Sequence, residues 1–166
     1  KLAIHAHRAM HGAFTENPKH GLSMMGLADF SRMAGVDSLH IGTGIGKMRG
    51  GKKEVSEISE EMEKQNVKAT KHRLAQKWGK IKPVFSVCSG GIYPGHIPFL
   101  MKSYGKDLII QAGGGVHWNP RGSKYGAMGM RQAVAAIMKG KTLKEYAKKN
   151  RELREALEKF GEKLRF

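Results

Sequence analysis

Short apolar runs alternate along this chain with longer stretches in which apolar residues recur at helical spacing. The strand-like runs lie near residues 2–6, 37–41, 83–88 and 107–112. Helical spacing is found between and after them, over residues 21–35, 97–105 and 126–140. A repeated strand, loop and helix is typical of a parallel α/β fold. The pattern therefore predicts four parallel strands in chain order, with the helices outside the sheet.

Two further stretches combine helical spacing with many charges. Residues 52–80 carry Val55, Ile58 and Met62 at helical spacing, and residues 139–165 form the second stretch. Thr142 and Glu145 have the spacing of a capping box at its start. Its expected apolar face consists of Leu143, Tyr146, Leu153, Leu157 and Phe160. We expect both stretches to be helical, with their charges on solvated faces.

The number of these units favours part of a barrel over a doubly wound sheet. A dinucleotide-type doubly wound sheet has a glycine-rich turn after its first strand, whereas the segment HAHRAMH contains no glycine. A TIM barrel has eight βα units over roughly 250 residues, and this chain of 166 residues holds about four. This number corresponds to about half of such a barrel, and the chain begins at Lys1, without an initiator methionine, within a predicted strand. We therefore predict one domain over residues 1–166, the C-terminal half of a TIM (β/α)8 barrel with about four βα units and a C-terminal helix.

Composition narrows the class of protein further. Hydrophobic residues make up 40% of the chain and charged residues 27%, as in ordinary globular domains. The sequence has no apolar run approaching the length of a membrane span, and its first residues lack the long apolar region of a secretory signal. We expect a cytoplasmic protein with no membrane partner. The single cysteine, Cys88, excludes internal disulfides and multi-cysteine metal sites.

The net charge of +16 and the pI near 10.1 raise the alternative of a nucleic-acid-binding domain. Much of this charge falls in the two charged helical stretches, and no basic groove interleaved with aromatic residues accompanies it. We therefore expect no nucleic-acid partner. Phosphorylated small molecules fit the charge equally well.

Polar and glycine-rich clusters follow all four predicted strands, and the carboxyl ends of parallel strands open on one face of a sheet. After the first strand come His5, His7, Arg8 and His11, and strand alternation places His5 and His7 on the same side. We do not expect zinc there, because no carboxylate or cysteine is close in sequence and Arg8 opposes a cation.

After the second strand, His40 precedes a glycine-rich segment that contains Lys47. This segment is not a P-loop, because Ile41 and Met48 occupy the positions of the first glycine and the hydroxyl residue. Its glycines are compatible with a mobile lid from which Lys47 stabilises developing negative charge.

The third and fourth strand ends consist largely of glycine. They contain Ser89, Gly90, Gly91, Gln111, Gly113, Gly114 and Gly115. Phosphate sites of TIM barrels commonly form at the last two strands, from backbone amides of these loops. A glycine pair also suits any tight turn, so the position of the two clusters at the last two strands indicates a phosphate site more strongly than either glycine pair alone.

Four motifs, in their order and spacing, resemble the large chain of ribulose bisphosphate carboxylase/oxygenase (RuBisCO). They are HAHRAMH, HIGTGIGKM, CSGG followed by PG, and IQAGGGVHWNPRG. The resemblance covers nearly the whole chain, is closest to archaeal-type forms, and corresponds to the catalytic barrel from its fifth strand onward.

The resemblance implies specific roles for the strand-end residues. His7 would be a proton-transferring catalytic residue, and Lys47 would reach over the closed site and stabilise the carboxylated transition state. Arg8 and His40 would hold one phosphate of ribulose bisphosphate, with Ser89 near the sugar. The other phosphate would be held by backbone amides around Gly91, Gly113 and Gly114, and Gly90 and Gln111 complete the expected substrate-binding set.

The resemblance also implies what this stretch leaves to other parts of the enzyme. The carbamylated lysine and acidic residues that hold magnesium belong to an earlier barrel strand, and the acidic stretch at residues 54–64 is periodic and helical. We therefore expect no metal ligand in this chain, and we expect the chain alone to be inactive. Its expected partner is the missing N-terminal half or a second large chain, and the parent enzyme is expected to be a homo-oligomer. The substrates would be ribulose bisphosphate and carbon dioxide. A RuBisCO-like enolase or isomerase acting on another phosphorylated sugar is the alternative, but Lys47 and the two phosphate sites favour the carboxylase.

Overall fold

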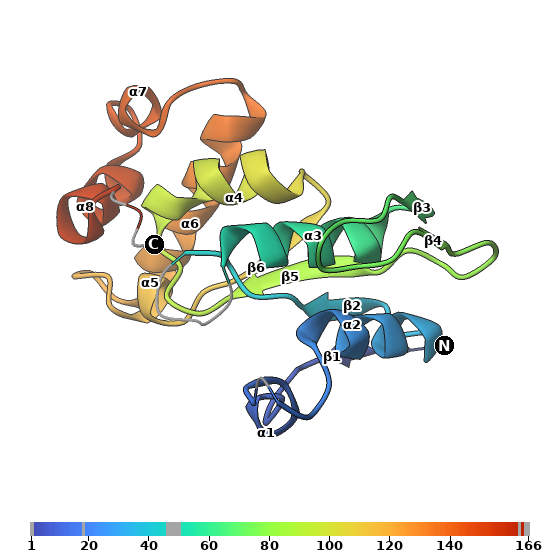
Figure 1. Cartoon of the computed structure of the whole chain (residues 1–166). Coiled ribbons are helices and arrows are strands. Elements are labelled where there is room, and N and C mark those ends of the chain that lie inside the picture. The colour runs from blue at the N-terminus through green and yellow to red at the C-terminus, as the bar shows by residue number, and fades with distance from the viewer. Residues whose placement is uncertain (1, 18, 46–50, 163, 165–166) are drawn as a thin grey trace.

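Four parallel strands form the central sheet. The computed structural model describes residues 2–17, 19–45, 51–162 and 164. The strands are β1 (His5–Ala6), β2 (Ser38–His40), β5 (Phe85–Ser89) and β6 (Leu108–Gln111), in the order β1-β2-β5-β6 (Figure 1). Every neighbouring pair is parallel. The predicted strands, their direction and their order are confirmed.

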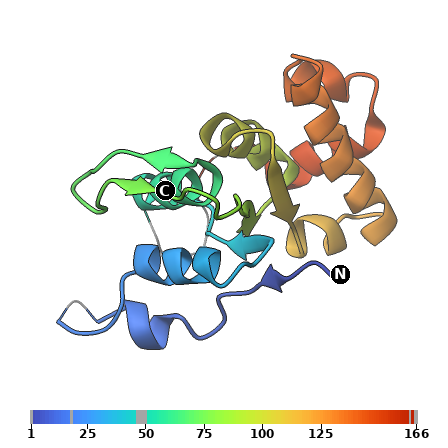
Figure 2. The same ribbon diagram turned by 90° about the vertical axis from the view of Figure 1, so that its right-hand side faces the viewer.

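Helices follow the strands along the chain. They are α1 (Gly12–Thr15), α2 (Met24–Met33), α3 (Lys52–Glu63), α4 (Ile97–Tyr104), α5 (Gly114–His117), α6 (Ser123–Met138), α7 (Leu143–Ala147) and α8 (Arg151–Phe160), with a short 3-10 helix, η1 (Pro94–His96). In Figure 2, α7 and α8 lie at the opposite end of the molecule from α1 and α2. Within the described residues, no helix has the length and apolar character needed to cross a bilayer.

The helices cover one face of the sheet. Leu39 and Cys88 point into a core built with side chains of α2, α3, α4 and α6. Side chains alternate along a strand, so Phe85 and Ile109 point to the other face, where they are 52% and 37% exposed. That second face carries the polar strand-end residues described below.

The prediction of a helix over the whole of residues 52–80 was wrong. The helix α3 ends at Glu63, and the chain turns back as an antiparallel hairpin of β3 (Asn66–Val67) and β4 (Gln76–Lys77). Trp78 is buried and its indole N–H donates to the Glu61 carboxylate at 3.0 Å. Arg73 pairs with Glu60 at 2.6 Å. These contacts between residues distant in sequence hold the hairpin against α3.

The expected single C-terminal helix is two helices, α7 and α8. The Thr142 side chain accepts a hydrogen bond from the Glu145 N–H, as the capping spacing predicted. The break comes at Asn150, which is the N-cap residue of α8 and whose side-chain amide donates to the Tyr146 carbonyl at 2.7 Å. Leu143 and Leu153 are both buried in the same hydrophobic core, so both helices pack on it despite the break.

Arg32 is fully buried and joins three segments of the chain. Its guanidinium lies 4.5 Å from the centre of the Trp78 ring and donates to the carbonyls of Glu61, Lys64 and Lys82. The bonds to Lys64 and Lys82 measure 2.9 and 3.2 Å. Arg32 therefore satisfies the buried Glu61 carbonyl and two partly buried carbonyls, at the end of α3 and before β5.

Candidate functional site

The carboxyl ends of the four strands meet at one edge of the sheet. His40 ends β2, Ser89 ends β5 and Gln111 ends β6, and Ser89 and Gln111 are register partners. His7 and Arg8 follow β1 directly. The structure therefore brings these predicted residues to one edge of the sheet, although they come from four separate parts of the sequence.

A continuous row of hydrogen bonds crosses three of these strands. Ser38 Oγ lies 2.8 Å from Nδ1 of His5, and Nε2 of His5 lies 2.9 Å from Nε2 of His40. Nδ1 of His40 then lies 2.8 Å from Ser89 Oγ. Both ring nitrogens of His40 are thus bonded within the protein, and a phosphate can contact this ring only after one of those bonds is rearranged.

Burial keeps His40 neutral. The side chain is 2% exposed, and its pKa is lowered to about 4, first by burial and then by the positive charges of His7, His5 and Arg8. At neutral pH the ring therefore acts as a hydrogen-bonding group. The His7 ring lies 4.4 Å from it, tilted by 58°. Among the described residues His7 has no hydrogen-bond partner, so its ring nitrogens are available to a ligand.

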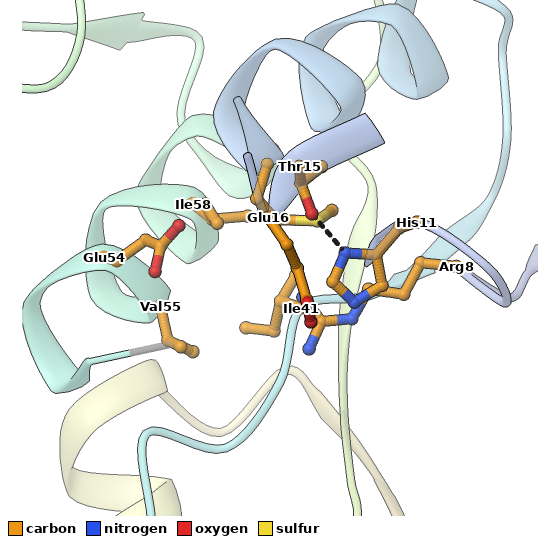
Figure 3. Close-up of a pocket in the computed structure, with 9 residues that line it drawn as sticks. Arg8, His11, Thr15, Glu16, Ile41, Glu54, Val55 and Ile58 are labelled. Carbon is orange, nitrogen blue, oxygen red and sulfur yellow. Dashed lines mark hydrogen bonds between the residues drawn. The ribbon is translucent and has the colours of Figure 1, made fainter. Parts of the chain in front are cut away.

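Arg8 lines a pocket between the end of β1 and the neighbouring helices. The pocket has a volume of about 210 Å³ and is lined by Arg8 and His11 together with residues of α1, α2 and α3, including Glu54 (Figure 3). Burial lowers the pKa of Arg8 and the charge of Glu54 partly offsets this. An arginine stays charged at any physiological pH, so Arg8 provides a fixed positive charge at the strand ends. His11 is held by Thr15, 2.8 Å from its Nδ1.

The two glycine-rich turns are packed directly against each other. Gly90 and Gly91 have φ angles of 100° and 67°, which favour glycine. A Cβ atom on Gly115 would lie 2.2 Å from the carbonyl oxygen of Ile92, so only glycine allows this close approach. The Tyr93 ring stacks on Phe160 of α8, with 4.6 Å between ring centres and 11° between planes. The turns after β5 and β6 therefore form one unit, supported by α8.

The predicted lid residue Lys47 lies outside the described residues, as do its neighbours 46 and 48–50. The residues before this segment are well anchored. Ile45 is buried, and the Tyr104 hydroxyl donates to the Thr43 carbonyl at 2.9 Å. Gly51, after the segment, is the N-cap residue of α3.

The strand ends do not suit magnesium. Within the described part of the chain, no group of three or more His, Cys, Asp or Glu side chains is placed to hold a metal ion. Magnesium prefers oxygen ligands, whereas this edge presents imidazoles, hydroxyls and the positive charge of Arg8. The residues present therefore do not fit a magnesium site.

Sequence reasoning did not assign roles to three residues of this region: His5, Ser38 and Glu54. The signal for the first two was available, because His5 and His7 are two positions apart, as are Ser38 and His40, and such residues share one face of a strand. Nothing in the sequence indicated that Glu54 shares a pocket with Arg8, because they come from separate elements.

Comparison with known proteins agrees with this geometry. The family model described as "Ribulose bisphosphate carboxylase large chain, catalytic domain" matches residues 1–160. The chain is 50% identical over 164 residues to the ribulose bisphosphate carboxylase of Methanosarcina barkeri, covering 98% of this chain and 38% of that protein. It is 51% identical over 160 residues to that of Methanocaldococcus jannaschii, with coverages of 95% and 38%.

Solved structures give the same result. A dimeric archaeal Rubisco from Hyperthermus butylicus matches with a TM-score of 0.89 and 48% identity, covering 98% of this chain and 38% of that one. An octameric Rubisco from Pyrococcus horikoshii matches with a TM-score of 0.82 and 46% identity, with coverages of 96% and 36%. The parallel sheet thus matches part of a larger catalytic domain, and the chain spans well under half the length of these relatives.

Proposed function

This chain belongs to the ribulose bisphosphate carboxylase large chain family, and we propose that it is the C-terminal half of that family's catalytic TIM barrel. The parent reaction is the addition of carbon dioxide to the enediol of ribulose bisphosphate. The helix-free face of the sheet supports this proposal, because in a closed barrel that face is the interior and its strand ends form the active site. The observation that carries it is the meeting of His7, Arg8, His40 and Ser89 at one edge.

The chain's own residues supply anion binding and proton transfer. Arg8 attracts one phosphate of the sugar, with His40 beside it as a neutral hydrogen-bonding partner once its bond to His5 opens. The paired turns at Gly90–Gly91 and Gly113–Gly114 offer backbone amides to the second phosphate. Ser89 and Gln111 contact the sugar between them. His7, whose ring nitrogens are available, transfers a proton at the reacting carbons, and Lys47 closes over the site.

Magnesium belongs to a different part of the parent enzyme in this proposal. The residues that the structure describes do not fit the ion, so we place its ligands in the portion of the relatives that this chain does not span. Without that portion, positioning and charge stabilisation at the reacting carbons are lost, and the chain alone does not fix carbon dioxide. Its partners are the N-terminal half or a second large chain. Since the two solved relatives are dimeric and octameric, we propose a homo-oligomeric parent enzyme.

Calorimetric titration of the chain with ribulose bisphosphate tests the binding part. We expect binding that weakens at least tenfold in Arg8→Gln, because a charged hydrogen bond contributes about 1.5–3 kcal/mol. Arg154→Gln, which removes an exposed charge on α8, is the matched control and retains wild-type affinity. Equal losses in the two variants would indicate that only net charge matters.

Carbon fixation assays test the catalytic part. The chain alone should be inactive. Adding a chain that carries the N-terminal domain and the earlier barrel strands, with magnesium and bicarbonate, should restore fixation that depends on ribulose bisphosphate. In that complex Lys47→Ala should suppress turnover much more than substrate binding, since the lysine acts on charge that develops in the transition state. Carboxylation by the chain alone would contradict the division of the site.

A further inference from the structure

Charge is unevenly divided between α3 and the hairpin that follows it. All five acidic residues of the stretch 52–82 lie on α3. Residues 64–82 carry seven lysines and arginines and no aspartate or glutamate. A solvated helical face with interleaved charges does not account for this segment, because its chain folds into the hairpin of β3 and β4. The positive charge of the hairpin therefore needs an explanation of its own.

Three of the seven cations of the hairpin segment are paired within the protein. Lys64 and Arg73 pair with Glu60 at 3.1 and 2.6 Å, and Lys82 pairs with Asp37. The other four are exposed, and among the described residues no carboxylate is within ion-pair distance of them. These four, named here the basic hairpin surface, are Lys68, Lys71, Lys77 and Lys80.

The strands of the hairpin turn two of these lysines away from α3. Val67 and Trp78 are 7% and 4% exposed, and Trp78 bonds to Glu61 of α3, so this side of the hairpin faces the helix. Neighbouring residues of a strand point to opposite sides, so Lys68 and Lys77 point outward. The register of β3 and β4 makes these two lysines diagonal neighbours on the outer side.

The carboxylates near the hairpin lie on its inner side. Glu61 is 2% exposed and accepts the bond from Trp78, and Glu60 is bonded to Arg73. Asp29 of α2 and Glu61 line a hollow between the helices and the loop of the hairpin. Within the described part of the chain, the outer side therefore presents positive charge with no carboxylate beside it. Such a surface is complementary to a negatively charged partner.

The hairpin is held in place before any partner arrives. The Arg73 guanidinium donates to the carbonyls of Glu57 and Lys68 at 2.8 and 3.1 Å, and the Thr70 N–H donates to the Arg73 carbonyl at 2.9 Å. The loop is thus tied to itself and to α3, which lowers the cost of ordering it on binding. In Figure 1 the hairpin projects away from α7 and α8. It leads into the amino end of β5, opposite the strand ends of the candidate site.

We propose that the basic hairpin surface binds an acidic segment of a partner protein. Nucleic acid also carries negative charge, but Trp78 is buried and the Arg73 guanidinium is bonded within the protein, so the hairpin offers no ring or guanidinium to bases. Leu74 of the loop, in contrast, is 85% exposed. A large apolar side chain among lysines fits a protein segment that carries an apolar residue beside its carboxylates.

Fluorescence anisotropy of a labelled glutamate-rich peptide with one leucine tests the charge of this surface. Two triple variants of the chain lose the same charge by replacement of lysine with glutamine. The positions are Lys68, Lys71 and Lys77 in the hairpin variant, and the exposed Lys106, Lys148 and Lys149 in the matched control. We expect the hairpin variant to bind the peptide at least threefold more weakly, because an exposed ion pair contributes about 0.2–1 kcal/mol. The control should stay within twofold of wild type. Equal losses in the two variants would overturn the proposal.

The apolar contact tests the class of partner. We expect Leu74→Ser to weaken binding of this peptide at least twofold and to leave binding of polyglutamate unchanged. Met138→Ser, which replaces a methionine of α6 that is 55% exposed, is the matched control and should change neither. Tighter binding of a DNA duplex than of the peptide, unaffected by Leu74→Ser, would overturn the proposal in favour of nucleic acid.

The parent enzyme supplies a last test of the same surface. We expect the peptide to bind equally well after the N-terminal half is added, because the hairpin lies opposite the strand ends of the candidate site. Loss of peptide binding would overturn the proposal, since the hairpin would then be an internal contact of the enzyme. The hairpin variant should keep wild-type affinity for ribulose bisphosphate, so the proposed function is tested separately.

Discussion

Replacing Gly115 with alanine should separate the two glycine-rich turns and destabilise the fold. The added Cβ would lie 2.2 Å from the Ile92 carbonyl oxygen and 3.2 Å from Tyr93 Cα. These are backbone atoms, so the backbone must move, and overpacking of this kind costs about 3 kcal/mol at the upper end. Alanine regains up to about 1 kcal/mol relative to glycine within a helix. The net loss in the free energy of unfolding is therefore about 2 kcal/mol.

Urea denaturation followed by circular dichroism measures this loss, and thermal melting should show Tm lower by about 4–8 °C for a chain of this size. The matched control is Gly113→Ala in the same turn, because a Cβ there meets no atom within 4 Å. We expect this control to lie within about 0.5 kcal/mol of wild type. Equal stabilities of the two variants would refute the reasoning, since the clash with the Ile92 carbonyl arises only at Gly115.

Three other perturbations give separate tests. Arg32→Met should lower the free energy of unfolding by about 3 kcal/mol in urea titrations, because it leaves the buried Glu61 carbonyl and the partly buried Lys64 and Lys82 carbonyls unpaired; the exposed Arg154→Met should change it little. Burial raises the pKa of Asp29 from 3.8 to about 6. The unfolded chain therefore loses this proton first, so stability should fall as pH rises from about 4 to 6, and Asp29→Asn should remove that part of the dependence. Strands β1 and β6 are the outer strands of the described sheet. Sedimentation velocity should show association at higher concentration, and Ile109→Lys should weaken it.

The sheet was predictable because its signal is local. Each strand is a short apolar run followed by glycine or polar residues, and right-handed crossovers fix the order once the strands are known. The prediction from helical spacing was wrong at residues 64–80, where the hairpin depends on the hydrogen bond from Trp78 to Glu61 and on the ion pair of Arg73 with Glu60. It also failed at Asn150, where one side-chain bond to a backbone carbonyl divides a periodic run. Such contacts are set by tertiary structure and leave no periodic signal.

The candidate site was likewise predictable only in part from the sequence. The chemical type of each strand end was visible in the sequence, so His7, Arg8, His40 and Ser89 could be named from their positions after apolar runs. The bond between His5 and His40 could not be predicted, because it depends on the register between β1 and β2 and on side-chain rotation. The burial that keeps His40 neutral likewise comes from the packed structure.

The stack of Tyr93 on Phe160 has a consequence for the order of folding. Strands in the sheet pair with the strands next to them in the sequence, whereas this stack joins the turn after β5 to the last helix. Contacts over a longer separation along the chain form more slowly. During synthesis, the sheet can therefore assemble while the Ser89 turn still lacks its support from α8. Packing of α8 on the turn after β5 is then a late step of maturation, and a nascent chain has its strands in place before this turn is held in its final position.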